Sequence, residues 1–403
     1  MKFSQKYYLF FSLIFIIFAN FSSRFGVISG TISNNYNFST VDDIIENGIA
    51  NHDFPSAVLV VGNEKDIIYQ NAYGRLTYDD DAKTTTMNTI YDLASVTKVI
   101  ATTSAIMKLY DQGMIDLNAP VSLYIPEFAV NGKSDITVLN LLLHNSGLTA
   151  WTPFYERDTC AEQVRAEIYG CTKEYPTGSK FVYSDYNAVL LGDIVERITG
   201  MKLDKYCKKN IFDMLGMTDT DYLIPLSLNY RIAPTENDTY WRHELLIGYV
   251  HDETAALLEG VSGNAGLFST GPDLYKFMRM MLNRGLYIDP RKVPAGNKYD
   301  TLFNPSTVDM FTSKVTGLGY LNTRALGWDT KPEPTSYPSQ CGSKFSGNCF
   351  GHTGYTGTSV WCDKEKKLII IFLTNRIYPK RGNEEIRNIR PKVHDEVCKA
   401  LGY

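Results

Sequence analysis

The stretch from Ser95 to Gln112 reads SVTKVIATTSAIMKLYDQ, and it restricts the possible folds more than any other part of the chain. Apolar residues recur along it at helical spacing, and Gly113 follows as a stop signal. The pattern predicts a helix that begins at Ser95. Residues three apart on a helix share one face, so the Ser95 hydroxyl and the Lys98 amine are expected to meet.

Outward from this helix, short β-rich runs lie towards both ends of the chain. Residues 57–62 and 66–74 have the pattern of a hairpin, and residues 350–352, 358–362 and 368–374 form three more strand-like runs before a terminal helix at about 384–401. Helical patterns fill the middle at 137–144, 186–199, 203–208, 273–283 and 306–313.

This order predicts an α/β (α+β) fold. We expect one antiparallel sheet built from both ends of the chain (about 40–92 and 320–403) and flanked by helices, with a mainly helical part (about 93–320) inserted.

Composition and charge are those of an ordinary globular protein. The chain has 403 residues, of which 44% are hydrophobic and 21% are charged, enough for one large core or two modest ones. Lys and Arg number 40 against 44 Asp and Glu, a net charge of −4, so no basic field is available to hold a phosphate backbone. Nucleic acid is therefore not expected as a partner.

The first two dozen residues predict export. Lys2 and Lys6 precede an uncharged run over 7–23 that is nearly all Leu, Ile and Phe up to Ala19. A spanning helix needs about 20 apolar residues, and this run stops short of that. We expect residues 1–22 to be a signal peptide, residues 34–403 to be the mature domain, and the protein to be secreted or lumenal. The alternative is an uncleaved N-terminal anchor, which would be the single membrane attachment.

An exported chain meets oxidising conditions, under which its seven cysteines can pair. Their close spacing favours Cys160 with Cys171 and Cys341 with Cys349, and an odd count leaves at least one unpaired. Two glycosylation sequons, which begin at Asn37 and Asn237, fit the same route.

Ser95 and Lys98 form a candidate catalytic pair. Backbone N–H groups in the first turn of a helix are unpaired and lie at the positive end of the dipole, which favours a developing oxyanion. A desolvated lysine loses its proton more readily and can accept the hydroxyl proton as Ser95 attacks. The alternative interpretation is an N-capping serine followed by a surface lysine.

Two further segments carry polar groups at informative places. Tyr183 lies just ahead of a predicted helix, within the segment 176–187. Residues 351–357 (GHTGYTG) form a glycine-dense link between two predicted strands. Taken singly, the first is typical of packing and the second of a hairpin.

Together, in this order and spacing, these segments resemble the signatures of the serine penicillin-recognising enzymes. The three family signatures are Ser-x-x-Lys, Tyr-x-Asn and Lys/His-Thr/Ser-Gly, which here correspond to Ser95–Lys98, Tyr183–Asp185 and His352–Gly354. The branch is that of class C β-lactamases and low-molecular-weight penicillin-binding proteins, with further similarity to the 4B type. Additional matching stretches cover nearly all of the mature chain, at 136–148, 211–217, 250–253, 263–269 and 373–376.

The resemblance implies a β-lactamase/transpeptidase-like fold and a role for each matching residue. Ser95 would be the acylated nucleophile and Lys98 its proton acceptor. Tyr183 would be the second base, serving the leaving group and then the deacylating water. Backbone N–H groups of Ser95 and Tyr355 would form the oxyanion hole.

The resemblance also implies a substrate-binding set, which comprises Asp185, His352, Thr353, Gly354 and Tyr355. His352 replaces the lysine of many relatives; its neutral imidazole can donate a hydrogen bond but gives less charge to a substrate carboxylate. Asp185 replaces asparagine, and its charge beside Lys98 should raise the pKa of the lysine. We expect weak β-lactamase activity, detectable esterase activity and a preference for amine-bearing substrates.

Other chemistries have less support in the sequence. There is no G-x-S-x-G elbow, which argues against an α/β-hydrolase. The six histidines form no metal-binding spacing, and neither a metal nor a cofactor is expected. His144 is interpreted as a structural hydrogen-bond partner. The expected function is a secreted serine hydrolase that acts on amide or ester bonds of a small-molecule or peptide substrate, as a D-amino-acid peptidase, a carboxylesterase or a weak β-lactamase. The alternative is a non-catalytic binding or filament-forming module that keeps the fold.

Overall fold

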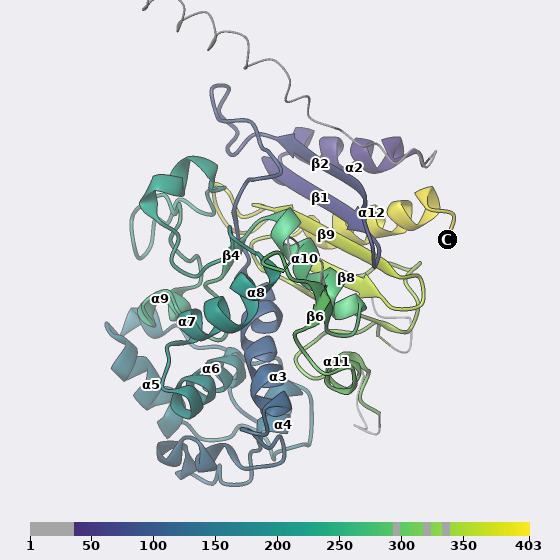
Figure 1. Ribbon diagram of the computed structural model, residues 1–403. Coiled ribbons are helices and arrows are strands. Elements are labelled where there is room, and N and C mark those ends of the chain that lie inside the picture. The colour runs from purple at the N-terminus through teal and green to yellow at the C-terminus, as the bar shows by residue number, and fades with distance from the viewer. Residues whose placement is uncertain (1–35, 293–298, 317–323, 333–338) are drawn as a thin grey trace, which may run out of the picture. The chain divides into compact units, whose positions relative to one another are not determined.

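A five-stranded antiparallel sheet joins the N-terminal hairpin to the C-terminal strands (Figure 1). The computed structural model describes residues 36–292, 299–316, 324–332 and 339–403, so the predicted signal peptide lies outside the described residues. The strands follow the order β2-β1-β9-β8-β7. Their bounds are β1 Ser56–Gly62, β2 Ile67–Gly74, β7 Cys349–Thr353, β8 Ser359–Asp363 and β9 Leu368–Thr374.

Pairing between β1 and β9 unites the two ends of the chain. The register runs from Ala57 opposite Thr374 to Gly62 opposite Ile369. The sheet expected from both ends of the chain is therefore present, and the fold-class prediction is confirmed. The predicted strands and helices described above lie within two residues of their observed bounds, apart from the helix at Ser95.

Both faces of the sheet are covered. Alternate side chains of β1 point to opposite faces, so Val58 and Val60 join one core while Leu59 and Val61 join the other. Helices α2 (Ser39–Ala50) and α12 (Ile386–Ala400) pack beside each other on the second face, and α10 (Gly271–Leu282) contacts the strands from the first (Figure 1). Burial on both faces explains why β1 and β9 read as continuous apolar runs.

The remaining elements form the inserted helical part and its connections. The helices are α3 Ser104–Asp111, α4 Val138–Leu142, α5 Ala161–Gly170, α6 Asp185–Thr199, α7 Leu203–Cys207, α8 Asp213–Leu215, α9 Glu253–Leu257 and α11 Pro305–Thr312. The short strands are β3 Tyr91–Asp92, which pairs with β4 Phe268–Ser269, and β5 Leu286–Ile288, which pairs with β6 Tyr299–Thr301. Short 3₁₀ turns lie at Val121–Leu123, Pro126–Ala129, Phe154–Glu156 and Leu226–Arg231, and a π-helical segment lies at Lys208–Phe212.

The helix expected from Ser95 is divided into three consecutive segments. A 3₁₀ turn at Ala94–Val96 leads into a π-helical segment at Lys98–Thr103, and α3 follows. The wider π turn alters the usual backbone pairing, and the Ser104 hydroxyl donates to the Val99 carbonyl over 2.9 Å. Such π segments occur often at functional sites, where they change which side chains share a face.

One of the two predicted cysteine pairs is wrong. Cys160 and Cys171 flank the two ends of α5, and a rise of about 1.5 Å per residue places their Cα atoms about 16 Å apart. Bridging needs Cα atoms closer than about 7 Å. No disulfide joins any of the seven cysteines in the structure, so the Cys341–Cys349 bridge stays a prediction; the two buried sulfur atoms lie 3.9 Å apart.

Within the described ranges, no helix combines the length and the apolar character needed to cross a membrane.

Candidate active site

Ser95 lies in the 3₁₀ turn that opens the helical segment, and Asp92 fixes that turn. The buried Asp92 carboxylate accepts the Ala94 N–H at 2.8 Å and the His251 N–H at 2.7 Å. Ala94 has a φ of 46°, in the left-handed region that an alanine rarely adopts. The nucleophile thus follows a strained residue whose conformation is held by a buried carboxylate.

Lys98 is buried beside Ser95, as the one-turn spacing predicted. Its Nζ donates to Ser95 Oγ at 2.9 Å and to the Asn264 carbonyl at 2.9 Å, and it lies 2.7 Å from Asp185 Oδ1. Burial alone would lower the pKa of Lys98, but the Asp185 carboxylate and the Tyr183 phenol outweigh burial and raise the pKa above its ordinary value. The expected effect of Asp185 is confirmed, and Lys98 is an ammonium ion at neutral pH.

Tyr183 lies just before α6, and its ring packs between His144 and Lys98. It stacks on His144 with ring centroids 4.6 Å apart, and Lys98 Nζ lies 5.1 Å from the centre of its ring. The Tyr183 hydroxyl is buried without a hydrogen-bond partner among the described residues, and burial raises the pKa of the phenol. The phenol is therefore protonated, and its hydroxyl lies beside Ser95 and Lys98.

His144 has the structural role that the sequence predicted. It is buried, and its Nδ1 accepts the Ser184 N–H at 3.1 Å. Burial and nearby cations lower the pKa of His144 well below its ordinary value, so the ring is neutral. It ties the end of α4 to the segment that carries Tyr183.

The link between β7 and β8 closes against the nucleophile turn. Thr356 Oγ1 donates to the Asp92 carbonyl at 2.7 Å, and Thr358 Oγ1 donates to the Leu93 carbonyl at 3.0 Å. A Cβ at Gly354 would lie 2.4 Å from the Leu93 oxygen, so only glycine permits this approach. The Tyr355 N–H donates to no described residue, as a hydrogen-bond donor of an oxyanion hole requires.

His352 faces the same space but differs from the expectation. Burial lowers the pKa of His352 to about 4, so the imidazole is neutral. Its Nδ1 lies 2.9 Å from the Thr353 carbonyl, which can only accept a hydrogen bond, so Nδ1 carries the proton. The buried Nε2 is then an acceptor without a partner among the described residues. His352 therefore accepts a hydrogen bond from a substrate, where the sequence suggested that it would donate one.

These groups open into a cavity of about 520 Å³. It is lined by Ser95, Phe181, Tyr183, Asp329, Gln340, the segment 352–355, Arg376, Ile386, Arg387 and Arg390. The structure therefore brings the predicted Ser95, Tyr183, His352, Thr353, Gly354 and Tyr355 to one cavity. Asp185 lies behind them and faces Lys98.

Sequence reasoning missed Arg390, an arginine of α12 that lines this cavity. It is 3% exposed and donates to Gln340 Oε1 at 2.6 Å, but its Nε has no partner and no described carboxylate pairs with it. Burial and the neighbouring Arg376 and Arg387 lower the pKa of Arg390 to about 9, so it stays charged at neutral pH. The sequence offered no signal for this residue, because it lies in the terminal helix, almost 300 positions after Ser95.

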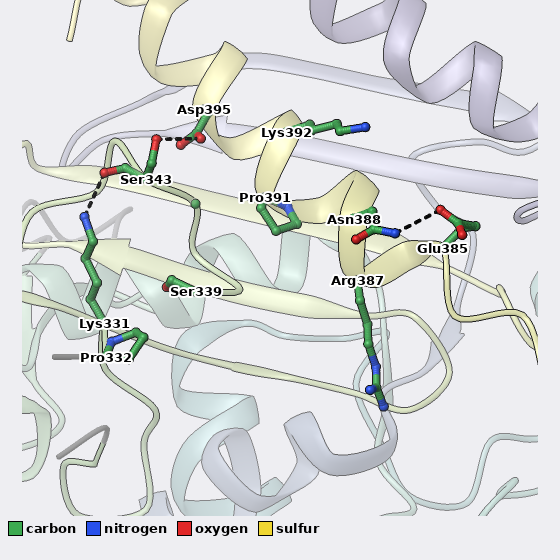
Figure 2. Close-up of a pocket in the computed structure, with 11 residues that line it drawn as sticks. Lys331, Pro332, Ser339, Ser343, Glu385, Arg387, Asn388, Pro391, Lys392 and Asp395 are labelled. Atoms are coloured by element: carbon green, nitrogen blue, oxygen red, sulfur yellow. Dashed lines mark hydrogen bonds between the residues drawn. The ribbon is translucent and has the colours of Figure 1, made fainter. Parts of the chain in front are cut away.

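A larger hollow of about 770 Å³ lies beside the N-terminal part of α12, between Pro391 and the segment around Ser343 (Figure 2). Its lining residues bond to one another; for example, Ser343 donates to Asp395 at 2.8 Å. Ser95 is not among the residues that line it. The hollow therefore does not replace the cavity at Ser95 as the catalytic site.

Comparison with known proteins gives one consistent family. The Beta-lactamase family model matches residues 41–393. The chain is 36% identical over 384 residues to the "N-acetylmuramyl-L-alanine amidase" of Bacillus subtilis (strain 168), covering 87% of this chain and 83% of that protein. It is 35% identical over 358 residues to the "Putative D-alanyl-D-alanine carboxypeptidase" of Escherichia coli (strain K12), covering 80% of this chain and 79% of that protein.

A solved structure shows the same fold. The penicillin-binding protein homologue of Caulobacter crescentus has a TM-score of 0.70 at 21% identity, and the match covers 90% of this chain and 97% of that one. The interpretation as a non-catalytic module has no support in the site, where Ser95 and Tyr183 line one cavity and Lys98 donates a hydrogen bond to Ser95. With the family match and this geometry together, the chain belongs to the β-lactamase family and is a serine hydrolase of the penicillin-binding-protein type.

Proposed function

We propose that the protein hydrolyses an amide bond in short, carboxylate-bearing peptides of the bacterial cell-wall type, through an acyl-enzyme on Ser95. The observation that carries the proposal is the 2.9 Å hydrogen bond between Lys98 Nζ and Ser95 Oγ at the base of the cavity. The names of the two relatives support the substrate class, because a muramyl-alanine bond and a D-alanyl-D-alanine bond are both amides of cell-wall peptides.

The geometry supports a two-step reaction. Ser95 Oγ attacks the scissile carbonyl, whose oxygen is stabilised by the backbone N–H groups of Ser95 and Tyr355. Tyr183, protonated and unpaired, supplies a proton to the leaving amine and afterwards orients the water that releases the acyl group.

Arg390 supports a substrate with a carboxylate. A buried arginine without a carboxylate partner is costly, and a substrate anion that pairs with it would recover that cost. Asp185 gives little support to the amine preference expected from the sequence, since its carboxylate is 17% exposed and lies 2.7 Å from Lys98. We therefore place the charge selectivity of the site at Arg390.

We also propose that the enzyme is exported from the cytoplasm and acts outside it. The N-terminal run after Lys2 and Lys6 has the composition of a signal peptide, which would deliver the enzyme outside the cytoplasm. Asn37 and Asn237, which begin the two sequons, are both exposed, as glycosylation requires.

The test is a substrate panel with matched termini. It comprises a peptide ending in D-alanyl-D-alanine as the free acid, the same peptide as the C-terminal amide, and muramyl-L-alanine. We expect amide hydrolysis by the wild type, none by Ser95→Ala, and a raised KM of Arg390→Leu for the acid but not for the amide. Equal hydrolysis of the free acid and the amide by the wild type would contradict the proposed recognition of a substrate carboxylate. No hydrolysis of any member would exclude the substrate class.

A further inference from the structure

The Asp185 carboxylate, 2.7 Å from Lys98 Nζ, favours the charged form of the lysine, and that form cannot act as a base. An ammonium group has three N–H donors and no lone pair. Lys98 Nζ donates to Ser95 Oγ at 2.9 Å and to the Asn264 carbonyl at 2.9 Å, and it lies 2.7 Å from Asp185 Oδ1 in an ion pair. The lysine must release a proton before it can accept one from Ser95.

Asp185 is the group placed to receive that proton. A peptide carbonyl such as that of Asn264 is too weak a base, and Ser95 is the proton donor in this step. The Asp185 carboxylate lies at the shortest of the three distances, and both members of the pair are shielded, with side chains 4% and 17% exposed. Transfer within the pair turns two opposite charges into two neutral groups, so the net charge of the cluster does not change.

We propose that Asp185 takes a proton from Lys98 during acylation, so that the two residues act together as the base for Ser95. This inference rests on the acyl-enzyme reaction of the proposed function. It changes the role of Asp185 from substrate contact to proton acceptor. Because Asp185 acts through Lys98, it is a positioning residue and does not contact the reacting carbonyl.

A second carboxylate lies in the same cluster. Asp252 is half-buried, and its Oδ1 accepts from Asn264 Nδ2 at 3.0 Å and from the Ala255 N–H at 2.8 Å. Burial and the charge of Asp185 raise the pKa of Asp252 to about 6. Asp252 therefore places a second negative charge near the Lys98–Asp185 pair.

The other titratable groups around the pair do not compete for the proton. Tyr183 is a neutral phenol, since burial raises its pKa. His144 and His352 are neutral, since burial lowers the pKa of each. The nearby Arg324 is paired with Asp329.

The step balances. One Lys98 N–H proton moves to Asp185, the Ser95 O–H proton moves to the vacated lone pair of Lys98, and the Ser95 Oγ–carbon bond forms. When the carbon–nitrogen bond breaks, the leaving amine takes the Tyr183 phenolic proton, and Tyr183 regains one from Lys98. Asp185 then returns its proton to Lys98. The only proton lost from the enzyme is that of Ser95, and it leaves on the amine.

The proposal predicts the direction of a pH shift. If the pair shares one proton, the wild-type rate decreases only when acid adds a second proton to the pair. The lower limb of the pH–rate profile, where the rate rises with pH, then lies in the acidic range. In Asp185→Asn, Lys98 must be deprotonated by the solvent, so the lower limb moves up by roughly 2 pH units or more, given ordinary pKa values near 4 and 10 and several units of lowering by burial. If Lys98 alone were the base, the wild-type limb would lie above pH 10 and the substitution would lower it.

The experiment measures the rate at which a fluorophosphonate labels Ser95 between pH 4 and pH 10.5, with circular dichroism as the folding control. An upward shift of the lower limb in Asp185→Asn supports the proposal. A downward shift, or folded Asp185→Asn that is not labelled even at high pH, overturns it. Wild type that is not labelled at all contradicts the proposed function instead.

Asp252→Asn provides a second arm if Asp185→Asn does not fold. Asparagine can still accept the Ala255 N–H at the start of α9, but it removes the charge that faces Asp185. The lower limb should then move to lower pH. A limb that stays or rises would contradict the proposal.

Discussion

Gly354→Ala tests the contact on which the oxyanion hole depends. Gly354 has no left-handed φ, so the substitution adds only a methyl group. That methyl carbon would lie 2.4 Å from the Leu93 oxygen and 2.2 Å from Thr358 Oγ1. Relief to 3.0 Å requires the Leu93 carbonyl and the β7–β8 link to separate by about 0.6 Å or more.

The separation has two consequences that can be measured. It moves the Tyr355 N–H away from Ser95, and the loss of one oxyanion donor costs about 10²- to 10³-fold in kcat. It also strains a packed contact, which costs about 1–3 kcal/mol in the free energy of unfolding. Hydrolysis of p-nitrophenyl acetate measures the first, and denaturant unfolding measures the second.

Gly170→Ala is the matched control. Gly170 ends α5, and an added Cβ there meets no atom within 4 Å. We expect unchanged kcat and a gain in stability of up to about 1 kcal/mol, because alanine favours a helix. Gly354→Ala with kcat within about threefold of the wild type and unaltered stability would refute the reasoning about this contact.

Three further predictions concern other parts of the molecule. Tyr183→Phe should lower the deacylation rate by about 10²- to 10⁴-fold with little change in binding, and unchanged turnover would assign Tyr183 to packing. Oxidised glutathione should join Cys341 to Cys349 and stabilise the fold by about 2.5 kcal/mol in the chain-entropy model. Cys341→Ser should abolish this effect, and a melting temperature that does not respond to reductant would contradict the prediction. Burial lowers the pKa of His394 to about 3, so below pH 6.5 the unfolded state binds a proton that the folded state does not. The free energy of unfolding should therefore decrease as the pH is lowered below 6.5, by up to about 5 kcal/mol at 1.36 kcal/mol per pKa unit. His394→Leu should reduce this loss in unfolding experiments, and an identical pH dependence would exclude His394 as a source.

The sequence predicts the parts of the fold that depend on local pattern. The strands of the sheet are apolar, β-rich runs bounded by turns, and the Ser95–Lys98 spacing needs only helical geometry to bring the two side chains together. Helix α2 was missed, although Val41, Ile45 and Gly48 recur on one buried face. This spacing of residues on one face is itself typical of a helix.

The rest of the site depends on contacts between distant segments. Asn264 and Arg390 come from far along the chain, and no local pattern marks either as a neighbour of Ser95. The pairing of Asp185 with Lys98 could be anticipated in sign, but the distance that turns it into a candidate proton acceptor could not. The incorrect Cys160–Cys171 pair arose because an eleven-residue spacing was read as a loop where the chain forms a helix.

Catalysis through an acyl-enzyme on Ser95 is tested by identifying the residue that becomes acylated. Tyr183→Phe protein, in which deacylation should be slow, is incubated with p-nitrophenyl acetate, quenched in acid and mapped by peptide mass spectrometry, with Ser95→Ala as the control. We predict one acetyl group on the peptide that contains Ser95 and none on the Ser95→Ala protein. An acetyl group on another residue, or the same adduct in the absence of Ser95, would contradict it.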